Sequence, residues 1–168
     1  MVGITAASCV VLVISQTSLS SNLSKISLSS RQKALAEELG RKMFTIQRKS
    51  LNGEELNDET DDFTLTLNKW ESAQKALITG SVIYGTNGEN SNASQEMLQQ
   101  SSSQFVQARD FLNAFILEPK SYESAQLDAG MEMLDTYIGS INNVTGKFLA
   151  ESELQGQVTI SAIVGISL

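Results

Sequence analysis

The strongest constraint on this chain is that an uncharged apolar segment stands at each end of a more polar sequence. Residues 1–15 (MVGITAASCVVLVIS) and 158–168 (VTISAIVGISL) contain no charged side chain. The segment between them, 16–157, holds all the charged residues and has the periodicity of helices. This layout is typical of a module that is held between two membrane-spanning helices.

Neither apolar segment is long enough to cross a membrane by itself, because a bilayer core requires about 20 apolar residues. We expect that the sequence is cut inside both membrane helices, so that 1–15 ends a first span and 158–168 begins a second. A signal peptide fits the first segment less well, since no basic residue precedes the apolar stretch. The remaining alternative is that both segments are helix ends buried in a globular core.

Composition limits the chemistry that the chain can perform. Its 168 residues suit one domain, and a net charge of −7 argues against nucleic-acid binding. The chain has no His, which removes the commonest general base and metal ligand. Its single Cys allows neither an intramolecular disulfide nor a Cys-based metal site. We therefore expect no cofactor, no metal and no catalytic step in this chain.

Apolar side chains recur at helical spacing in four segments. The pattern predicts helices up to about residue 50, from about 58 to a loop at 85–92, from 94 to Pro119, and from 121 to about 157. Asp58 or Thr60 is the expected cap of the second helix, and Ser94 that of the third. The expected inward residues are Leu28, Leu35, Leu39, Met43, Ile46, Phe63, Leu67, Trp70, Gln74, Leu77, Met97, Leu98, Phe105, Leu112, Phe115, Leu127, Met131, Leu134, Ile138, Ile141 and Phe148.

Four helices joined by short loops predict an all-α fold, an up-down-up-down four-helix bundle. The outer helices are the longer pair and overhang the inner pair by roughly 15 Å at 1.5 Å per residue. Both termini then emerge at the same end, and the two apolar segments enter one membrane. We expect an inner or cytoplasmic membrane location, with residues 16–157 periplasmic or extracellular.

The segment 26–39 is the strongest candidate for a binding site. Gln32 falls on the inward stripe between Leu28 and Leu35, and the cations Arg31 and Lys33 flank it. One interpretation is a buried polar layer that fixes the register of the helices. The other is a ligand site in which charged side chains near a bundle cleft or dimer axis bind a small anion. The sequence leaves both interpretations open.

Residues 29–39 (SSRQKALAEEL) resemble the G-R-Q-R-M-L-S-Q-R-I/M box of a known family. That box opens the sensor domain of type IV pilus methyl-accepting chemotaxis transducers, and is more distantly similar to the P-box of nitrate/nitrite sensor kinases. Phe63, Leu67, Trp70 and Gly80 resemble a second family pattern, F-x3-L-x2-W followed by Gly. The resemblance implies a homodimeric four-helix sensor domain between two membrane helices, followed by a HAMP linker and an output module.

The same resemblance assigns the site residues. Arg31 and Gln32 match the R-Q of the box, and Lys33 stands where nitrate sensors have the Arg that contacts the anion. Glu38 replaces the second Arg of the box, and Arg41, one turn later, is its expected substitute. A small anionic ligand at Arg31, Gln32, Lys33 and Arg41 is therefore implied.

The expected function is that of a ligand-sensing extracytoplasmic domain in a bacterial transmembrane receptor, either a chemoreceptor or a sensor histidine kinase of a two-component system. Binding would be relayed through the first and fourth helices. One alternative is a membrane-tethered structural or interaction protein without a small-molecule ligand. A small soluble bundle with buried apolar ends is the other.

Overall fold

The computed structural model describes the backbone of residues 2–87 and 89–166, and the side chains of 20–87 and 89–158. It contains four α-helices: α1 (Val2–Leu51), α2 (Asn57–Thr79), α3 (Asn92–Leu117) and α4 (Ser124–Ile166). A short 3-10 helix, η1 (Pro119–Ser121), lies between α3 and α4. The predicted all-α class is confirmed for the described part of the chain, where a single isolated β-bridge is the only extended pairing.

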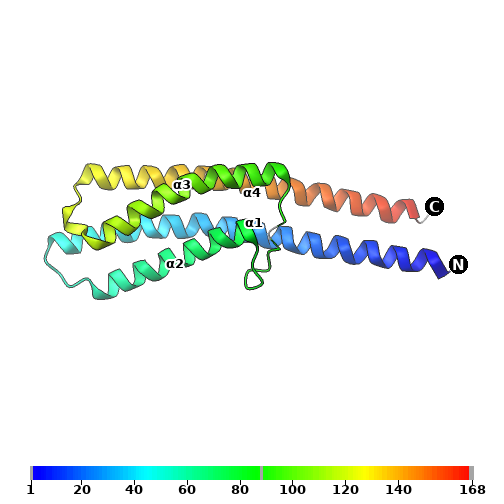
Figure 1. Cartoon of the computed structure of the whole chain (residues 1–168), viewed down its shortest axis with the longest axis horizontal. Helices are drawn as coiled ribbons and strands as arrows, with labels where there is room; N and C mark the ends of the chain where they lie inside the picture. Colours follow the sequence, from blue (N-terminus) through cyan, green and yellow to red (C-terminus); the bar gives the residue numbers. More distant parts are fainter. Residues whose placement is uncertain (1, 88, 167–168) are drawn as a thin grey trace.

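The four helices lie lengthwise beside one another (Figure 1). Helix α1 packs against both α2 and α4, and α3 packs against α4. Helices α1 and α4 run antiparallel, because the hydrogen bonds that join them run from Gln32–Tyr137 to Asn22–Gln155, with the residue numbers falling on α1 as they rise on α4. Both outer helices continue past the shorter inner pair, and the two chain termini lie at the same end (Figure 1).

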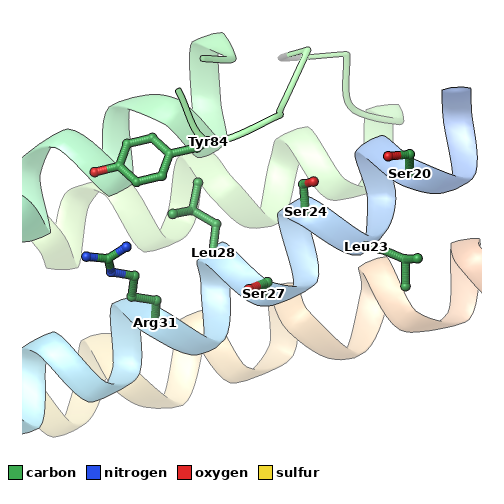
Figure 2. A pocket seen from close by; sticks show the side chains of 7 residues that line it. All are labelled: Ser20, Leu23, Ser24, Ser27, Leu28, Arg31 and Tyr84. Carbon is green, nitrogen blue, oxygen red and sulfur yellow. The ribbon is translucent and has the colours of Figure 1, made fainter. Parts of the chain in front are cut away.

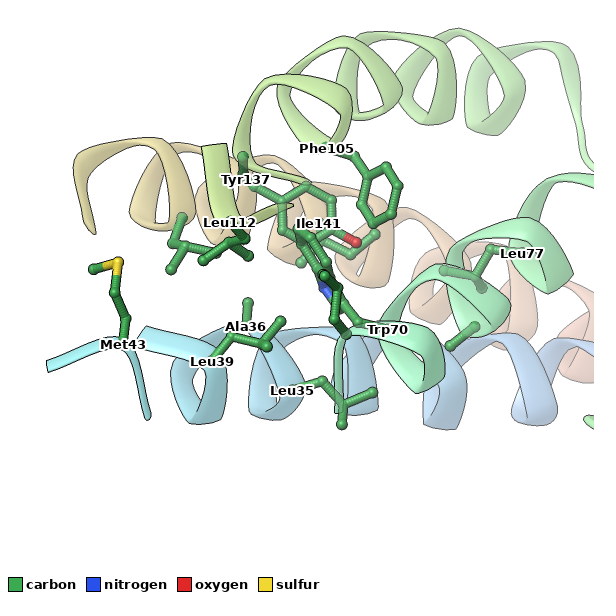
Figure 3. Close-up of a cluster of buried hydrophobic side chains, with 14 of the residues drawn as sticks. Leu35, Ala36, Leu39, Met43, Trp70, Leu77, Phe105, Leu112, Tyr137 and Ile141 are labelled. Carbon is green, nitrogen blue, oxygen red and sulfur yellow. The ribbon is translucent and has the colours of Figure 1, made fainter. Parts of the chain in front are cut away.

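The core lies where the predicted stripes meet, and the predicted inward residues are buried or half-buried. At its centre the rings of Trp70 and Phe105 have centroids 4.3 Å apart, and Trp70 packs edge-on against Tyr137 at 5.0 Å (Figure 3). Tyr137 and Val144, which the sequence analysis did not assign to the core, are fully buried on α4. Burial of these large side chains supplies the main driving force for packing the helices.

Two predicted caps and one predicted helix start are wrong. Helix α2 begins at Asn57 after Leu56, with no side-chain cap, so neither Asp58 nor Thr60 caps it. The cap of α3 is Ser91, whose hydroxyl accepts the Ser94 backbone N–H at 3.1 Å. Helix α4 begins at residue 124 rather than 121, because residues 119–121 form η1.

No helix in the described part of the chain has an apolar stretch long enough to cross a membrane. The predicted membrane segments, 1–15 and 158–168, are helical over residues 2–15 and 158–166. Apart from that of residue 158, the side chains on which this prediction depends lie outside the described residues.

Glycine permits a close approach of α4 to α3 at one point. A Cβ added at Gly130 would lie 2.1 Å from Cε1 of Phe111, and Phe111 is held in place by an edge-on contact with Tyr122 at 5.5 Å. A Cβ at Gly139, on the exposed side of the same helix, would meet nothing within 4 Å. The close packing of α4 on α3 therefore requires a glycine at position 130 but not at position 139.

We predict that Gly130→Ala lowers the free energy of unfolding by about 1–2 kcal/mol, because overpacking outweighs the gain in helix propensity. Gly139→Ala, the matched control, should raise it by about 0.5–1 kcal/mol. Urea unfolding followed by far-UV circular dichroism measures both. Equal effects of the two substitutions would show that α3 and α4 are further apart than described.

Candidate functional site

Gln32, the central residue of the predicted site, is fully buried in the bundle. Its side-chain Nε2 donates a hydrogen bond to the backbone carbonyl of Trp70 at 2.9 Å. Its Oε1 accepts a hydrogen bond from the Tyr137 hydroxyl at 2.7 Å. Both ends of the amide are thus engaged by the protein, as expected for a polar layer that fixes the register of the helices.

A second amide completes this buried network. The Tyr137 hydroxyl also lies 2.8 Å from Oε1 of Gln74, while Nε2 of Gln74 has no partner among the described residues. A hydroxyl has only one proton to donate, and the Gln32 amide is fixed by the Trp70 carbonyl. Rotating the Gln74 amide by 180° brings Nε2 to the hydroxyl, which then accepts from Gln74 and donates to Gln32. The resulting chain of donors runs from Gln74 on α2 to Tyr137 on α4, Gln32 on α1 and back to Trp70 on α2.

Burial raises the pKa of Tyr137 well above its usual range, and Trp70 beside it acts weakly in the opposite direction. The hydroxyl therefore keeps its proton in the folded protein at a pH where the unfolded chain loses it. The resulting stabilisation is fully present below the unfolded pKa, about 10. It is lost as the pH rises above that value.

We predict that Tyr137→Phe lowers the free energy of unfolding by about 1–3 kcal/mol at neutral pH, since it leaves buried amide groups without a partner. The wild-type protein should lose additional stability above about pH 10, by up to about 1.4 kcal/mol per pH unit. The variant should lose less over the same range. Urea unfolding at several pH values tests this, with Tyr84→Phe as the control outside the network. An unchanged alkaline slope in Tyr137→Phe would contradict it.

The three predicted cations are not gathered around Gln32. Arg31 is exposed and its guanidinium carbon lies 6.0 Å from the centre of the Tyr84 ring. Lys33 faces solvent and forms a 3.8 Å ion pair with Glu37 on its own helix. Arg41 is exposed further along α1. The four residues therefore occupy a buried layer and separate surface positions on α1, and do not line one pocket.

Arg31 alone among them lines a groove between α1 and the loop that joins α2 to α3 (Figure 2). The groove has a volume of about 340 Å³. Gly85, with φ of +68°, lets the loop approach α1 so closely that a Cβ there would lie 3.1 Å from the Ser24 hydroxyl. The lining residues are Ser20, Leu23, Ser24, Ser27, Leu28, Arg31 and Tyr84.

A second cleft, of about 430 Å³, lies between α1, α4 and the same loop. We call it the Lys25 cleft, after the lysine at its base. Unlike the first groove, it combines charges of both signs with amides and hydroxyls from three parts of the fold. Its lining residues are Ser21, Asn22, Lys25, Asn87, Glu89, Asn90, Ser91, Glu151, Leu154 and Gln155.

Lys25 is the most unusual residue of this cleft, because only 3% of its surface is exposed. Its ammonium donates to the backbone carbonyl of Glu89 and lies 5.8 Å from the centre of the Phe148 ring. Burial lowers the pKa of Lys25, while the charges of Glu151 and Glu89 act in the opposite direction. Neither carboxylate forms an ion pair with Lys25 in the described part of the chain.

The opposite wall of the cleft is organised by Glu151 on α4. Its carboxylate accepts hydrogen bonds from the hydroxyls of Ser91 and Ser94, the latter at 2.9 Å, and pairs with Lys147 at 3.6 Å. The cleft is bridged by the Asn22 side-chain N–H, which donates to Oε1 of Gln155 at 2.9 Å. This bond joins α1 directly to α4.

The sequence analysis missed this cleft. Lys25 lies three positions before Leu28 and seven before Gln32, so its inward position could have been read from the helical spacing. Its partners could not, since Glu89 and Glu151 are far away in the sequence. Among the described residues, no group of His, Cys, Asp and Glu side chains is placed to hold a metal ion.

Comparison with models of protein families, with curated proteins and with solved structures found no match to this chain.

Proposed function

We propose that this chain is the sensory domain of a homodimeric transmembrane signalling receptor, folded as an up-down-up-down four-helix bundle. Residues 1–15 and 158–168 would lie in an inner or cytoplasmic membrane and 16–157 outside it. The observation that carries the proposal is the continuity of α1 and α4. Each runs unbroken from the far end of the body to the end where both termini lie (Figure 1).

Unbroken helices suit a relay because each joins the cleft region to the end where the termini lie without an intervening loop. The Lys25 cleft lies between these two helices near the point where they leave the shorter inner pair. A ligand that entered it would contact both helices and compete with the Asn22–Gln155 bond across the cleft. Such a ligand biases the receptor only as far as its affinity differs between the two arrangements of α1 and α4.

A membrane-tethered interaction protein is the second candidate, and one feature favours it. The loop between α2 and α3 begins with a tight turn, closed by a bridge between Ser81 and Thr86. Val82 and Ile83 at its tip are 99% and 92% exposed. Together these two side chains form a small exposed apolar patch that another protein would cover on binding.

We predict that a bound ligand changes the distance between α1 and α4 next to the cleft and leaves the far end of the body unchanged. The chain is reconstituted in phospholipid vesicles with Cys9→Ser, and spin labels are placed at Leu23→Cys and Leu154→Cys, both exposed positions. Pulsed electron spin resonance then measures the distance with and without nitrate, acetate or a mixture of the standard amino acids.

The matched control pair is Leu51→Cys with Ser124→Cys, at the opposite end of α1 and α4. A shift at the cleft pair, larger than that of the control pair, is the expected result with at least one of the three probes. If none of the probes moves the cleft pair, the receptor proposal is wrong and the membrane-tethered interaction protein is favoured. If the chain does not associate with vesicles, both candidates are wrong.

A further inference from the structure

Lys25 has more hydrogen-bond donors than acceptors that it contacts in the described part of the chain. An ammonium has three N–H donors, and within the described part of the chain the Glu89 carbonyl is the one acceptor that Lys25 contacts. Only 3% of the surface of Lys25 is exposed, so bulk water does not surround the side chain. An oxygen-bearing group inside the cleft, above all a carboxylate, would satisfy the remaining donors.

The same cleft is unsuited to a simple anion. Its lining contains one cation, Lys25, and two carboxylates, those of Glu89 and Glu151. A free anion on Lys25 would be repelled by both carboxylates, whereas a simple cation near Glu151 would be repelled by Lys25 and by Lys147. Glu151 and Glu89 act on Lys25 through their charges but, among the described residues, form no ion pair with it, so groups of both signs line the same cleft.

We propose that the Lys25 cleft binds a free α-amino acid with a small polar side chain. The α-carboxylate would accept hydrogen bonds from the Lys25 ammonium, and the α-ammonium would lie at the carboxylate of Glu151. The cleft volume of about 430 Å³ falls within the range of small-molecule sites. The polar side chains of Ser21, Asn22 and Asn87 suit a short polar ligand side chain better than an apolar one.

This assignment rests on the proposed sensory function and adds the class of stimulus to it. The carboxylate of the ligand would be held by α1 and its ammonium by α4, so one molecule would clamp the two helices together. The α2–α3 loop would close the site, because Glu89 and Ser91 belong to that loop and contact Lys25 and Glu151. A ligand with only one of the two charges could not make this connection.

Isothermal titration calorimetry on the vesicle-reconstituted chain tests the proposal with three matched probes. L-Serine carries both charges, 3-hydroxypropanoate lacks the ammonium, and ethanolamine lacks the carboxylate. We expect saturable binding of L-serine and at least about tenfold weaker binding of the other two, because each leaves a buried charge unpaired. Equal binding of 3-hydroxypropanoate and L-serine would overturn the proposal.

Substitutions locate the site. Lys25→Met keeps the length of the side chain and should fold, because it removes a charge that burial disfavours. We expect it to weaken L-serine binding at least about tenfold, as should Glu151→Gln. Lys75→Met and Glu153→Gln, at exposed positions outside the cleft, are the controls and should bind as the wild type does. Lys25→Met, which tests the carboxylate end of the ligand, locates the site even if Glu151→Gln does not fold.

Two results would refute the assignment in different ways. If Lys25→Met binds L-serine normally while Arg31→Ala with Lys33→Ala abolishes binding, the ligand occupies the cationic surface of α1. If nitrate or acetate moves the spin-label pair at Leu23 and Leu154 while L-serine does not bind, the sensory function stands and the amino acid proposal fails.

Discussion

The hydroxyl of Tyr137 holds the central layer of the bundle together, and the rest of the structure depends on it. It joins the side chains of Gln32 and Gln74, and Gln32 continues to the Trp70 carbonyl, so the network links α1, α2 and α4. A buried polar network is favourable only when its members are satisfied together, and a shift of one helix by a turn would break several of its bonds. The network therefore fixes the axial register of the three helices.

That register also sets which groups of the neighbouring elements lie next to Lys25. Lys25 precedes Gln32 by seven positions, or two helical turns, so both side chains point toward the same side of α1. Toward the termini, the α1–α4 seam changes from apolar to polar: the Thr145 hydroxyl donates to that of Ser29 at 2.8 Å, and Asn22 donates to Gln155 at 2.9 Å. The free energy needed to separate two helices locally is lower where polar contacts join them than where large aromatic side chains are packed between them. The seam is thus fixed at its centre and adjustable near the cleft.

The sequence was sufficient to predict the helices and their buried faces, because apolar spacing is a local property. It placed Gln32 on the inward stripe but left open whether that amide binds a ligand or fixes register; the bonds to Trp70 and Tyr137 favour the second reading. The cleft was beyond local analysis, since its lysine, its loop and its carboxylate come from three distant segments. A lysine is most often solvated, so its residue type gave no sign of burial, although the helical spacing of Lys25 placed it on the inward side.

Stability alone gives a weak reason for a lysine at position 25. The charges of Glu151 and Glu89 and the ring of Phe148 favour the ammonium, but burial has the larger effect and lowers its pKa. Its one hydrogen bond in the described part of the chain is to the backbone carbonyl of Glu89. An unbranched apolar side chain such as methionine would fill the same space against Phe148 without the desolvation cost. Methionine, however, has no hydrogen-bond donor to offer to a molecule in the cleft between α1 and α4. The position of the charge is therefore easier to explain by what enters the cleft than by what holds the fold together.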